Sequence, residues 1–387
     1  MTTTMQGIPR EATIAIDDML DKCAQIKAGQ EVLILAQIDG LYGGDNLVDE
    51  QTVSWIQAAV QNRGANASVL WIDEPAKVHA WRIPPVLKAA LTHCDVMINH
   101  SFDLVAEEIM EFRHLFESKE PDFIMVRNFA TTAPLLCTAW AQTPHELVSE
   151  IRYQASVPFL QEGVSWQLTD DNGTHLEGMV AASDNPLFPV YTTRRTEVGG
   201  YRPWPEWVIP PIHITETSGT VVFDSMLSWW SRYVGISPYF KRPIRLTVED
   251  CRIKEIEGGE EADALKRFLE EMKKFLGDGV YDFTGIHTGV HPQAIVGAHQ
   301  CPSLLYRRVI DHSHACNIHF HIGAPPPTKE YPYWMHCTGD IRTATWQVGD
   351  TLLHDRGKMT VLDHPDVLAV ANKYPGRPGL GLEPWRY

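Results

Sequence analysis

The sequence lacks the marks of disulfide-rich, membrane-spanning and nucleic-acid-binding proteins. Its 387 residues include seven cysteines, none in a CxxC pair, which argues against a disulfide framework and against a structural zinc cage. No apolar run approaches the roughly 18–20 residues that a membrane span needs. Acidic residues outnumber basic ones by 49 to 33, for a formal net charge of −16, and a field of that sign repels phosphate backbones and anionic lipids.

The N-terminal segment also lacks the basic and apolar regions of a signal peptide. We therefore expect a cytoplasmic protein whose partner is a small molecule, with no nucleic acid and no membrane, and we expect a homo-oligomer. The length favours two to three domains of roughly 150 residues each.

The first 160 residues alternate between helical and strand-like patterns. Short apolar runs at 31–36, 67–72, 95–99 and 122–126 suit buried parallel strands, and helical patterns such as 50–63 separate them. This alternation predicts an α/β domain over residues 1–160, built on a doubly wound parallel sheet. No GxGxxG follows the first strand, so a dinucleotide site is disfavoured.

The pattern changes near residue 160. An Asn172-Gly173 turn predicts a hairpin, and several short strand-like runs follow it. One amphipathic helix is predicted over 260–276, and turns alternate with strands from there to residue 359. Residues 161–387 are thus predicted to form an α+β, mainly antiparallel domain.

Histidine is concentrated in this second part of the chain. Nine of the 17 histidines lie between residues 287 and 354, a stretch that makes up less than a fifth of the sequence. Histidine is the commonest metal ligand in proteins, so this concentration favours a functional site in the second part of the chain.

His287 and His291 stand four residues apart in a segment with Gly285, Gly289 and Pro292. On a helix this spacing would place both imidazoles on one face, as in HExxH zinc sites, but the glycines and the proline predict a loop instead. The two rings could converge there, or only one could point inward. The alternative is a surface loop with two ordinary histidines.

The segment 317–323 has a strand-like pattern that places His319 and His321 on the same face. They could line a pocket, or the strand could be half-buried with its polar residues toward solvent. Further on, His336 and Asp340 offer one nitrogen and one oxygen ligand, as Fe(II), Mn(II) and Zn(II) sites use. Asp340 could instead be a turn residue after Gly339.

Arg342 and Glu206 are the other charged candidates. Arg342 is predicted to bind a carboxylate or enolate oxygen of a substrate. Glu206 lies between Trp204 and Trp207, where it is either a site acid with a raised pKa or a surface residue between packed rings.

In kind and order, these segments resemble those of the M29-type metallo-aminopeptidases and of 2,5-dihydroxypyridine 5,6-dioxygenase, a mononuclear iron enzyme that opens a pyridine ring. The similarity covers the N-terminal strand–helix layer, the turn at 170–174, the Pro- and Trp-rich segment 203–211 and the strand at 219–224. It continues through segment 285–292, the strand at 317–323 and the late His336. The resemblance implies a metal-dependent enzyme of this superfamily and leaves the subfamily open.

The resemblance also assigns roles to single positions. Glu206 falls where the peptidases keep a metal-binding Glu, and His319 where they keep a His in a strand that ends in glycine. His336 matches the His of a His-x-Asp pair that both enzymes use. The Asp of that pair is replaced here by Thr338, and the nearest carboxylate is Asp340.

One more ligand is implied near residues 283–285, where neither Glu nor His occurs, although His287 lies two positions further on. The set of ligands that a two-metal peptidase centre needs is therefore incomplete, whereas ligands for a mononuclear site are still present.

From these observations we predict a mononuclear non-heme Fe(II) dioxygenase that cleaves the ring of a small aromatic or N-heteroaromatic acid. Two histidines and one carboxylate would leave open positions for substrate and O₂. The predicted metal ligands are His287, His291, His336 and Asp340, with His287 and His291 as alternatives for one position. The residues predicted to act in catalysis are Glu206, His319 and Arg342.

Two other functions remain open. The first is a metallohydrolase with zinc or manganese, in which Glu206 would be the general base for a metal-bound water. The second is a metal-free protein whose histidine-rich strands bind a ligand. In each case we expect the first domain to contribute to the walls of the site rather than to supply metal ligands, because its histidines are scattered along the sequence. These histidines are His79, His93, His100, His114 and His145.

Overall fold

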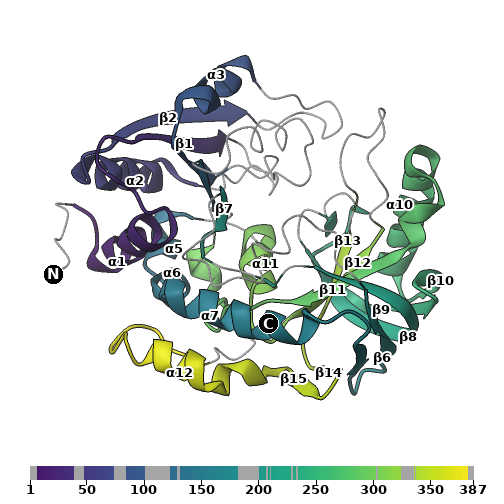
Figure 1. The fold of residues 1–387 in the computed structure, drawn as a ribbon. Coiled ribbons are helices and arrows are strands. Elements are labelled where there is room, and N and C mark those ends of the chain that lie inside the picture. The colour runs from purple at the N-terminus through teal and green to yellow at the C-terminus, as the bar shows by residue number, and fades with distance from the viewer. Residues whose placement is uncertain are drawn as a thin grey trace.

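The computed structural model describes residues 7–38, 48–73, 84–100, 123–128, 131–181, 200–205, 208–209, 211–227, 230–231, 234–301, 304–323, 335 and 337–381. They form two sheets with helices between and around them (Figure 1). The helices are α1 (Arg10–Asp18), α2 (Glu50–Asn62), α3 (Pro85–His93), α5 (Ala133–Leu136), α6 (Ala139–Gln142), α7 (His145–Ser156), α10 (Glu260–Leu276), α11 (Leu304–His312) and α12 (Pro365–Ala371).

The first sheet is parallel and has five strands in the order β2-β1-β3-β4-β7. Each apolar run predicted from the sequence is one of its strands. Strand β1 lies between β2 and β3, so the connections through α2 and through α3 run in opposite directions across the sheet. Right-handed crossovers would place these two helices on opposite faces. The strands are β1 (Glu31–Ile38), β2 (Asn66–Asp73), β3 (Val96–His100), β4 (Ile124–Arg127) and β7 (Gly200–Pro203).

Helix α2 shows how the sequence fixes this layer. The Asp49 carboxylate accepts a hydrogen bond from the backbone N–H of Thr52 at 2.7 Å, which caps the helix. Its second oxygen accepts from the N–H of Ala133 at 2.8 Å, at the start of α5. Val53 and Ile56 are buried on one face of α2, as the predicted helical pattern requires.

Strand β7 joins the parallel sheet although it follows the hairpin of the second sheet. It pairs with β4 from Gly200 to Pro203, and Arg202 donates to the backbone carbonyl of Cys23 at 2.6 Å. The parallel sheet therefore includes residues from beyond position 160.

The second sheet is large and antiparallel, and its main path runs β11-β12-β13-β8-β6-β5-β14-β15-β16, with β9 and β10 extending from β8. The 15-residue strand β8 pairs with β11 near its beginning and with β13 near its end. The parallel sheet with helices and the separate antiparallel sheet confirm the predicted combination of layers. The strands are β5 (Ser165–Thr169), β6 (His175–Val180), β8 (Ile212–Met226), β9 (Tyr239–Glu249), β10 (Arg252–Glu257), β11 (Phe283–Thr288), β12 (Ile318–Ile322), β13 (Cys337–Ile341), β14 (Thr345–Val348), β15 (Thr351–Asp355) and β16 (Lys358–Met359).

A row of polar residues crosses five strands of this sheet. Direct cross-strand partners are His287 and His319, then His319 and Asp340, then Asp340 and Ser225, and finally Ser225 and Tyr239. Directly opposed residues lie side by side on one face, so the register alone brings these groups together. We call this set the polar row.

Helix α11 lies between the two sheets (Figure 1) and contacts the polar row through Arg308 and His312. The predicted alternation of turns and strands is wrong here. Arg308, Asp311 and His312 are buried together with the apolar residues of the helix, so charged residues occupy positions that an amphipathic pattern reserves for apolar ones.

The predicted loop at His287 is also wrong, because Phe283–Thr288 is the buried strand β11. Gly289 follows it and lies directly against the backbone of Ser313 and His314, where a Cβ atom would overlap. The glycine thus marks a close approach of two backbones rather than a flexible loop.

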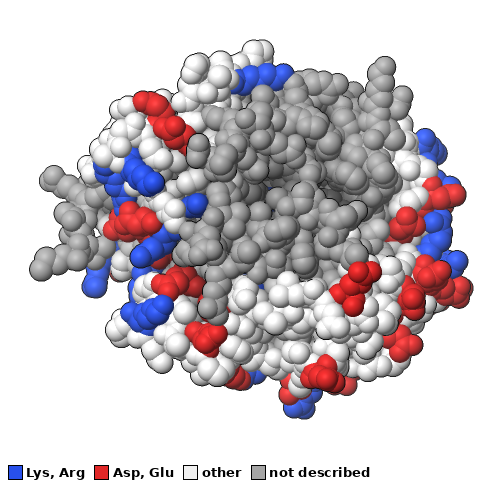
Figure 2. All heavy atoms as spheres, in the orientation of Figure 1, with Lys and Arg blue, Asp and Glu red and all other residues white. Residues whose placement is uncertain are grey.

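The surface agrees with the mixed charge of the sequence. Acidic and basic side chains are interspersed around the described part of the face in Figure 2. The longest described helix, α10, has 17 residues and an acidic first turn. No helix in the described ranges is long and apolar enough to cross a membrane. All seven cysteines are free.

Candidate metal centre

Three histidines from two strands and the end of helix α11 converge at one point. His287 comes from β11, His319 from β12, and His312 is the last residue of α11. One nitrogen of each lies within 4.8 Å of the others, and all three side chains are buried. The rings of His312 and His319 are stacked, with centroids 3.6 Å apart and planes 12° apart, and His287 meets His319 edge-on.

His319 is the most unusual member of this cluster. Its side chain is fully buried, yet within the described chain neither ring nitrogen has a hydrogen-bond partner. Burial holds its pKa well below the ordinary value, and the neighbouring His312 and His287 lower it further. The ring is therefore neutral and keeps a free lone pair, as metal coordination requires.

His287 is already oriented by the backbone. Its Nδ1–H donates to the carbonyl of Ile209 at 3.0 Å, so Nε2 carries the lone pair. This second-nitrogen hydrogen bond is typical of metal-binding histidines. Nε2 of His287 lies 2.8 Å from Nε2 of His321. The imidazole rings of His319 and His321 both contact His287, as the alternating pattern of segment 317–323 predicts for two residues on one face.

The chemistry of this cluster suits a divalent transition metal. Imidazole nitrogens bind zinc, iron, copper and nickel, and three of them leave coordination positions for other ligands. A fully buried imidazole such as His319, with both ring nitrogens unpartnered within the described chain, costs free energy in a dry core. The residues present therefore fit a metal ion, and His287, His312 and His319 would hold it.

A second group of charges adjoins the histidines. Asp340 forms an ion pair with Arg308, and both side chains are fully buried. Its Oδ1 lies 3.2 Å from Nδ1 of His312 and 3.8 Å from Nε2 of His319. The hydroxyl of Ser225 donates to Oδ2 at 3.4 Å. Asp340 is thus part of the buried network and not a solvent-exposed turn residue.

The structure places the other predicted residues in different surroundings. Arg342 donates to Ser225 at 2.8 Å and pairs with Asp224. His291 is buried away from this cluster: its ring faces Trp140, and its Nδ1 accepts from the N–H of Gln293 at 3.2 Å. Of the two alternative histidines, the structure brings His287 into the cluster.

Two predicted positions, Glu206 and His336, lie outside the described residues, as does Trp207 beside Glu206. Thr338, at the position where the resemblance implies an aspartate, accepts a hydrogen bond from the N–H of Leu227 at 3.3 Å. Its hydroxyl therefore binds the backbone of the segment that follows β8.

Sequence reasoning missed His312 and Arg308. His312 belongs to the histidine-rich stretch but stands in no recognisable ligand spacing. The available signal is that Arg308 and His312 are four residues apart, which places both on one face of a helix; the helix itself was not predicted.

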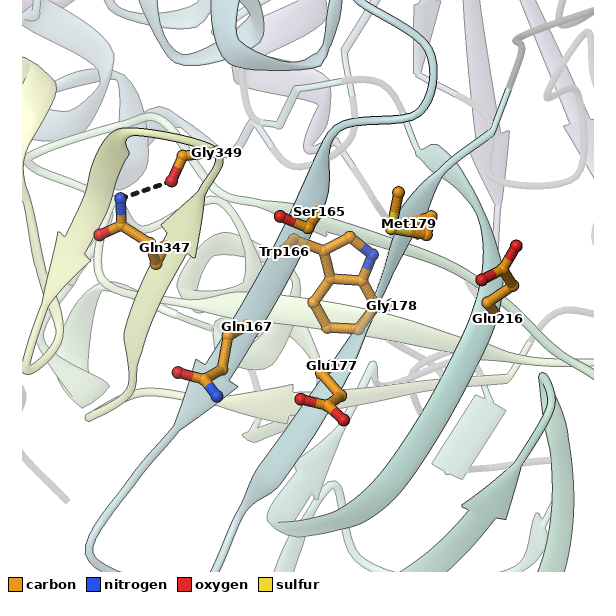
Figure 3. Close-up of a pocket in the computed structure, with 9 residues that line it drawn as sticks. All are labelled: Ser165, Trp166, Gln167, Glu177, Gly178, Met179, Glu216, Gln347 and Gly349. Carbon is orange, nitrogen blue, oxygen red and sulfur yellow. Dashed lines mark hydrogen bonds between the residues drawn. The ribbon is translucent and has the colours of Figure 1, made fainter.

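A hollow of about 400 Å³ lies elsewhere, on the outer face of the antiparallel sheet. Figure 3 shows Gln167, Glu177 and Glu216 around it, from strands β5, β6 and β8. Its lining contains none of the predicted site residues and no histidine. The hollow thus lacks nitrogen ligands, and the buried cluster is the better candidate for chemistry.

Histidines of the first sheet have ordinary surroundings where they are described. His100 is fully buried at the end of β3, its Nδ1 lies 2.9 Å from the hydroxyl of Thr131, and burial lowers its pKa to about 3. His145 begins α7. His79 and His114 lie outside the described residues. That this domain supplies walls rather than ligands stays a prediction.

Comparison with known proteins agrees with the motifs. The family model described as 2,5-dihydroxypyridine 5,6-dioxygenase (NicX) matches residues 12–303. No curated protein sequence matches the chain. The solved structure of 2,5-dihydroxypyridine dioxygenase from Pseudomonas putida KT2440 is similar with a TM-score of 0.59 at 16% identity, over 93% of this chain and 99% of that chain.

AmpT from Thermus thermophilus is similar with a TM-score of 0.54 at 11% identity, over 91% of this chain and 99% of that chain. At these identities the two structures show a shared fold, and that fold extends over nearly the whole chain. The family model confirms the resemblance to the 2,5-dihydroxypyridine 5,6-dioxygenases.

Proposed function

Because the chain belongs to the 2,5-dihydroxypyridine 5,6-dioxygenase family, we propose that it opens the ring of a small hydroxylated aromatic or N-heteroaromatic acid with O₂. The matching segment includes His287 but ends at residue 303. The roles of His312 and His319 therefore rest on the geometry of the cluster.

The observation that carries the proposal is the state of His319. A fully buried imidazole with two unpartnered nitrogens is costly unless something binds it. The ring is stacked on His312 and meets His287 edge-on, so a single ion can take one nitrogen of each ring. We propose Fe(II) as that ion, because imidazole suits iron as a ligand and iron can exchange electrons with O₂.

The residues of this chain contribute position and charge. The Ile209 carbonyl fixes the tautomer of His287, and burial keeps His319 neutral. Three neutral ligands leave the full charge of a divalent ion uncompensated, whereas two histidines and a carboxylate would cancel one unit of it. Such a centre favours a substrate that binds as an anion, which agrees with a hydroxylated aromatic acid. The surrounding burial excludes bulk water from the reacting groups.

The test is oxygen consumption by anaerobically purified protein loaded with Fe(II), with 2,5-dihydroxypyridine as the probe substrate. We expect one O₂ consumed per ring opened, together with loss of the ring's ultraviolet absorbance. Ring cleavage or amide hydrolysis that proceeds with zinc or manganese under anaerobic conditions would instead support the metallohydrolase.

His336 and Glu206 remain proposals from the family resemblance. His336→Ala is expected to lose metal if it is a further ligand. Glu206→Gln is expected to slow turnover without loss of metal if it acts on the substrate. Metal analysis of both variants separates these roles from a purely structural one.

A further inference from the structure

Asp340 occupies the centre of the polar row, between the histidine cluster and the charged groups on its other side. The sequence predicts it as a metal ligand. We propose that Asp340, held in place by Arg308, is instead a positioning residue that orients His312 toward the metal. This inference rests on the metal centre of the proposed function.

The two carboxylate oxygens have different neighbours. Oδ2 accepts from the hydroxyl of Ser225 at 3.4 Å and makes the contact with Arg308. Oδ1 faces the cluster, 3.2 Å from Nδ1 of His312 and 3.8 Å from Nε2 of His319. The shorter approach is to Nδ1 of His312 and would leave Nε2 of that ring for the metal, and a carboxylate in this position orients a ligating histidine.

Arg308 explains why this carboxylate stays where it is. Its side chain is fully buried, and its Nε and Nη1 have no hydrogen-bond partner in the described chain. Asp340 is its salt-bridge partner, while the Tyr239 ring lies 5.9 Å from the guanidinium. A buried cation that loses its counter-charge is strongly disfavoured.

Coordination by Asp340 would therefore bring a divalent ion against the same carboxylate that neutralises Arg308. The ion and Arg308 would then repel each other across this carboxylate in a dry core, where charges are weakly screened. A metal bound by three histidines, with Asp340 one layer away, avoids this conflict. His287 shows the same design, with the Ile209 carbonyl in the role that we assign to Asp340.

The test is titration of the metal-free protein with Co(II), whose visible absorption reports the ligand set. The informative variant is Arg308→Lys, because it keeps every formal charge but replaces a planar fork with a point donor. We expect its Co(II) dissociation constant to rise about 10-fold, and that of Asp340→Asn up to about 100-fold, the range for outer-layer partners of metal-binding histidines. At saturation, both variants should show the spectrum of the unmodified protein.

The matched control is Arg307→Lys, on the same helix, whose arginine approaches Asp311 at 3.8 Å rather than Asp340. We expect no change in its Co(II) affinity. Circular dichroism and thermal unfolding establish that each variant is folded, and Arg308→Lys keeps the test possible if Asp340→Asn does not fold.

Two results would overturn the inference. A saturated Co(II) spectrum that changes in Asp340→Asn would show that the carboxylate is a ligand. An unchanged affinity in Arg308→Lys would show that Arg308 does not position the site. If the unmodified protein binds no Co(II), Zn(II) or Fe(II), the proposed function fails as a whole, which is a different outcome from either of these.

Discussion

Two groups of buried histidines lie in the second part of the chain, and they differ in what their ring nitrogens face. In the cluster of His287, His312 and His319, the nitrogens converge on one another. In the other group, His291 accepts from a backbone N–H and His354 lies 3.1 Å from the hydroxyl of Thr288. These two rings are held singly by neighbouring protein groups.

Burial does not distinguish the two groups. It lowers the pKa of His291 and His354 to about 3 and holds the pKa of His319 well below its ordinary value. All these rings are therefore neutral at pH 7 and chemically able to bind a metal. Convergence of the nitrogens separates a candidate metal centre from a set of packed core histidines.

The largest expected effect is on metal content. His319→Ala removes one of the three proposed ligands, so we expect the dissociation constant for Fe(II) or Co(II) to rise by more than the ~100-fold typical of outer-layer changes. His354→Ala is the matched control, since it is also a fully buried histidine of the second sheet, and it should keep its metal. Elemental analysis after gel filtration measures both.

Equal metal loss in the two variants would erase the difference between the groups. Metal retained by His319→Ala would remove the three-histidine centre.

The second prediction concerns acid stability of the metal-free protein. His100, His291 and His354 have native pKa values of about 3, whereas the unfolded value is near 6.5. Below pH 6.5 the unfolded chain binds protons that the native state does not. Stability is therefore full above that pH and falls as the pH drops toward 3, by about 1.4 kcal/mol per pH unit for each histidine.

Urea unfolding at pH 7.0 and pH 5.5 measures this slope, and His354→Gln should reduce it by the share of one histidine. A slope that is unchanged in this variant would mean that His354 is protonated in the native state.

The third prediction is a loss of stability without a loss of metal. His354→Ala leaves a cavity and removes one of the hydrogen-bond partners of the Thr288 hydroxyl, which also contacts the carbonyls of Gly289 and Asn317, so we expect about 2 kcal/mol of destabilisation. Chemical denaturation of the metal-free variant gives the value. A negligible change would mean that the ring contributes little to packing.

The smallest expected effect is at Thr338. Thr338→Val keeps the shape of the side chain but leaves the N–H of Leu227 without its acceptor, which should cost about 1 kcal/mol. Metal affinity should not change, because this hydroxyl binds backbone. A fall in Co(II) affinity would instead place Thr338 in the metal site.

The sequence anticipated the elements whose pattern is local. The strands of the parallel sheet and the helix Glu260–Leu276 lie where the apolar periodicity predicted them. Helix α11 was not predicted, because its charged residues are buried against partners that come from strands distant in the sequence. Arg308 looks like a surface residue until Asp340, 32 positions away in the sequence, is placed beside it.

The candidate site was anticipated in part for the same reason. His287 and His319 were singled out from local motifs, and register then made them direct neighbours. His312 joined them through the packing of a helix against a sheet, which no spacing in the sequence encodes. The position of His291 was likewise decided by a contact with α6, through Trp140.

Strand β7 has a consequence for how the chain is made. During synthesis, β1 to β4 emerge long before Gly200–Pro203, so the outer edge of β4 stays open while some 70 further residues are added. An open edge of a buried sheet is a template for pairing with other chains. A fragment ending at residue 160 would keep that edge permanently, so we expect it to aggregate, and the nascent chain depends on its later half to close its first sheet.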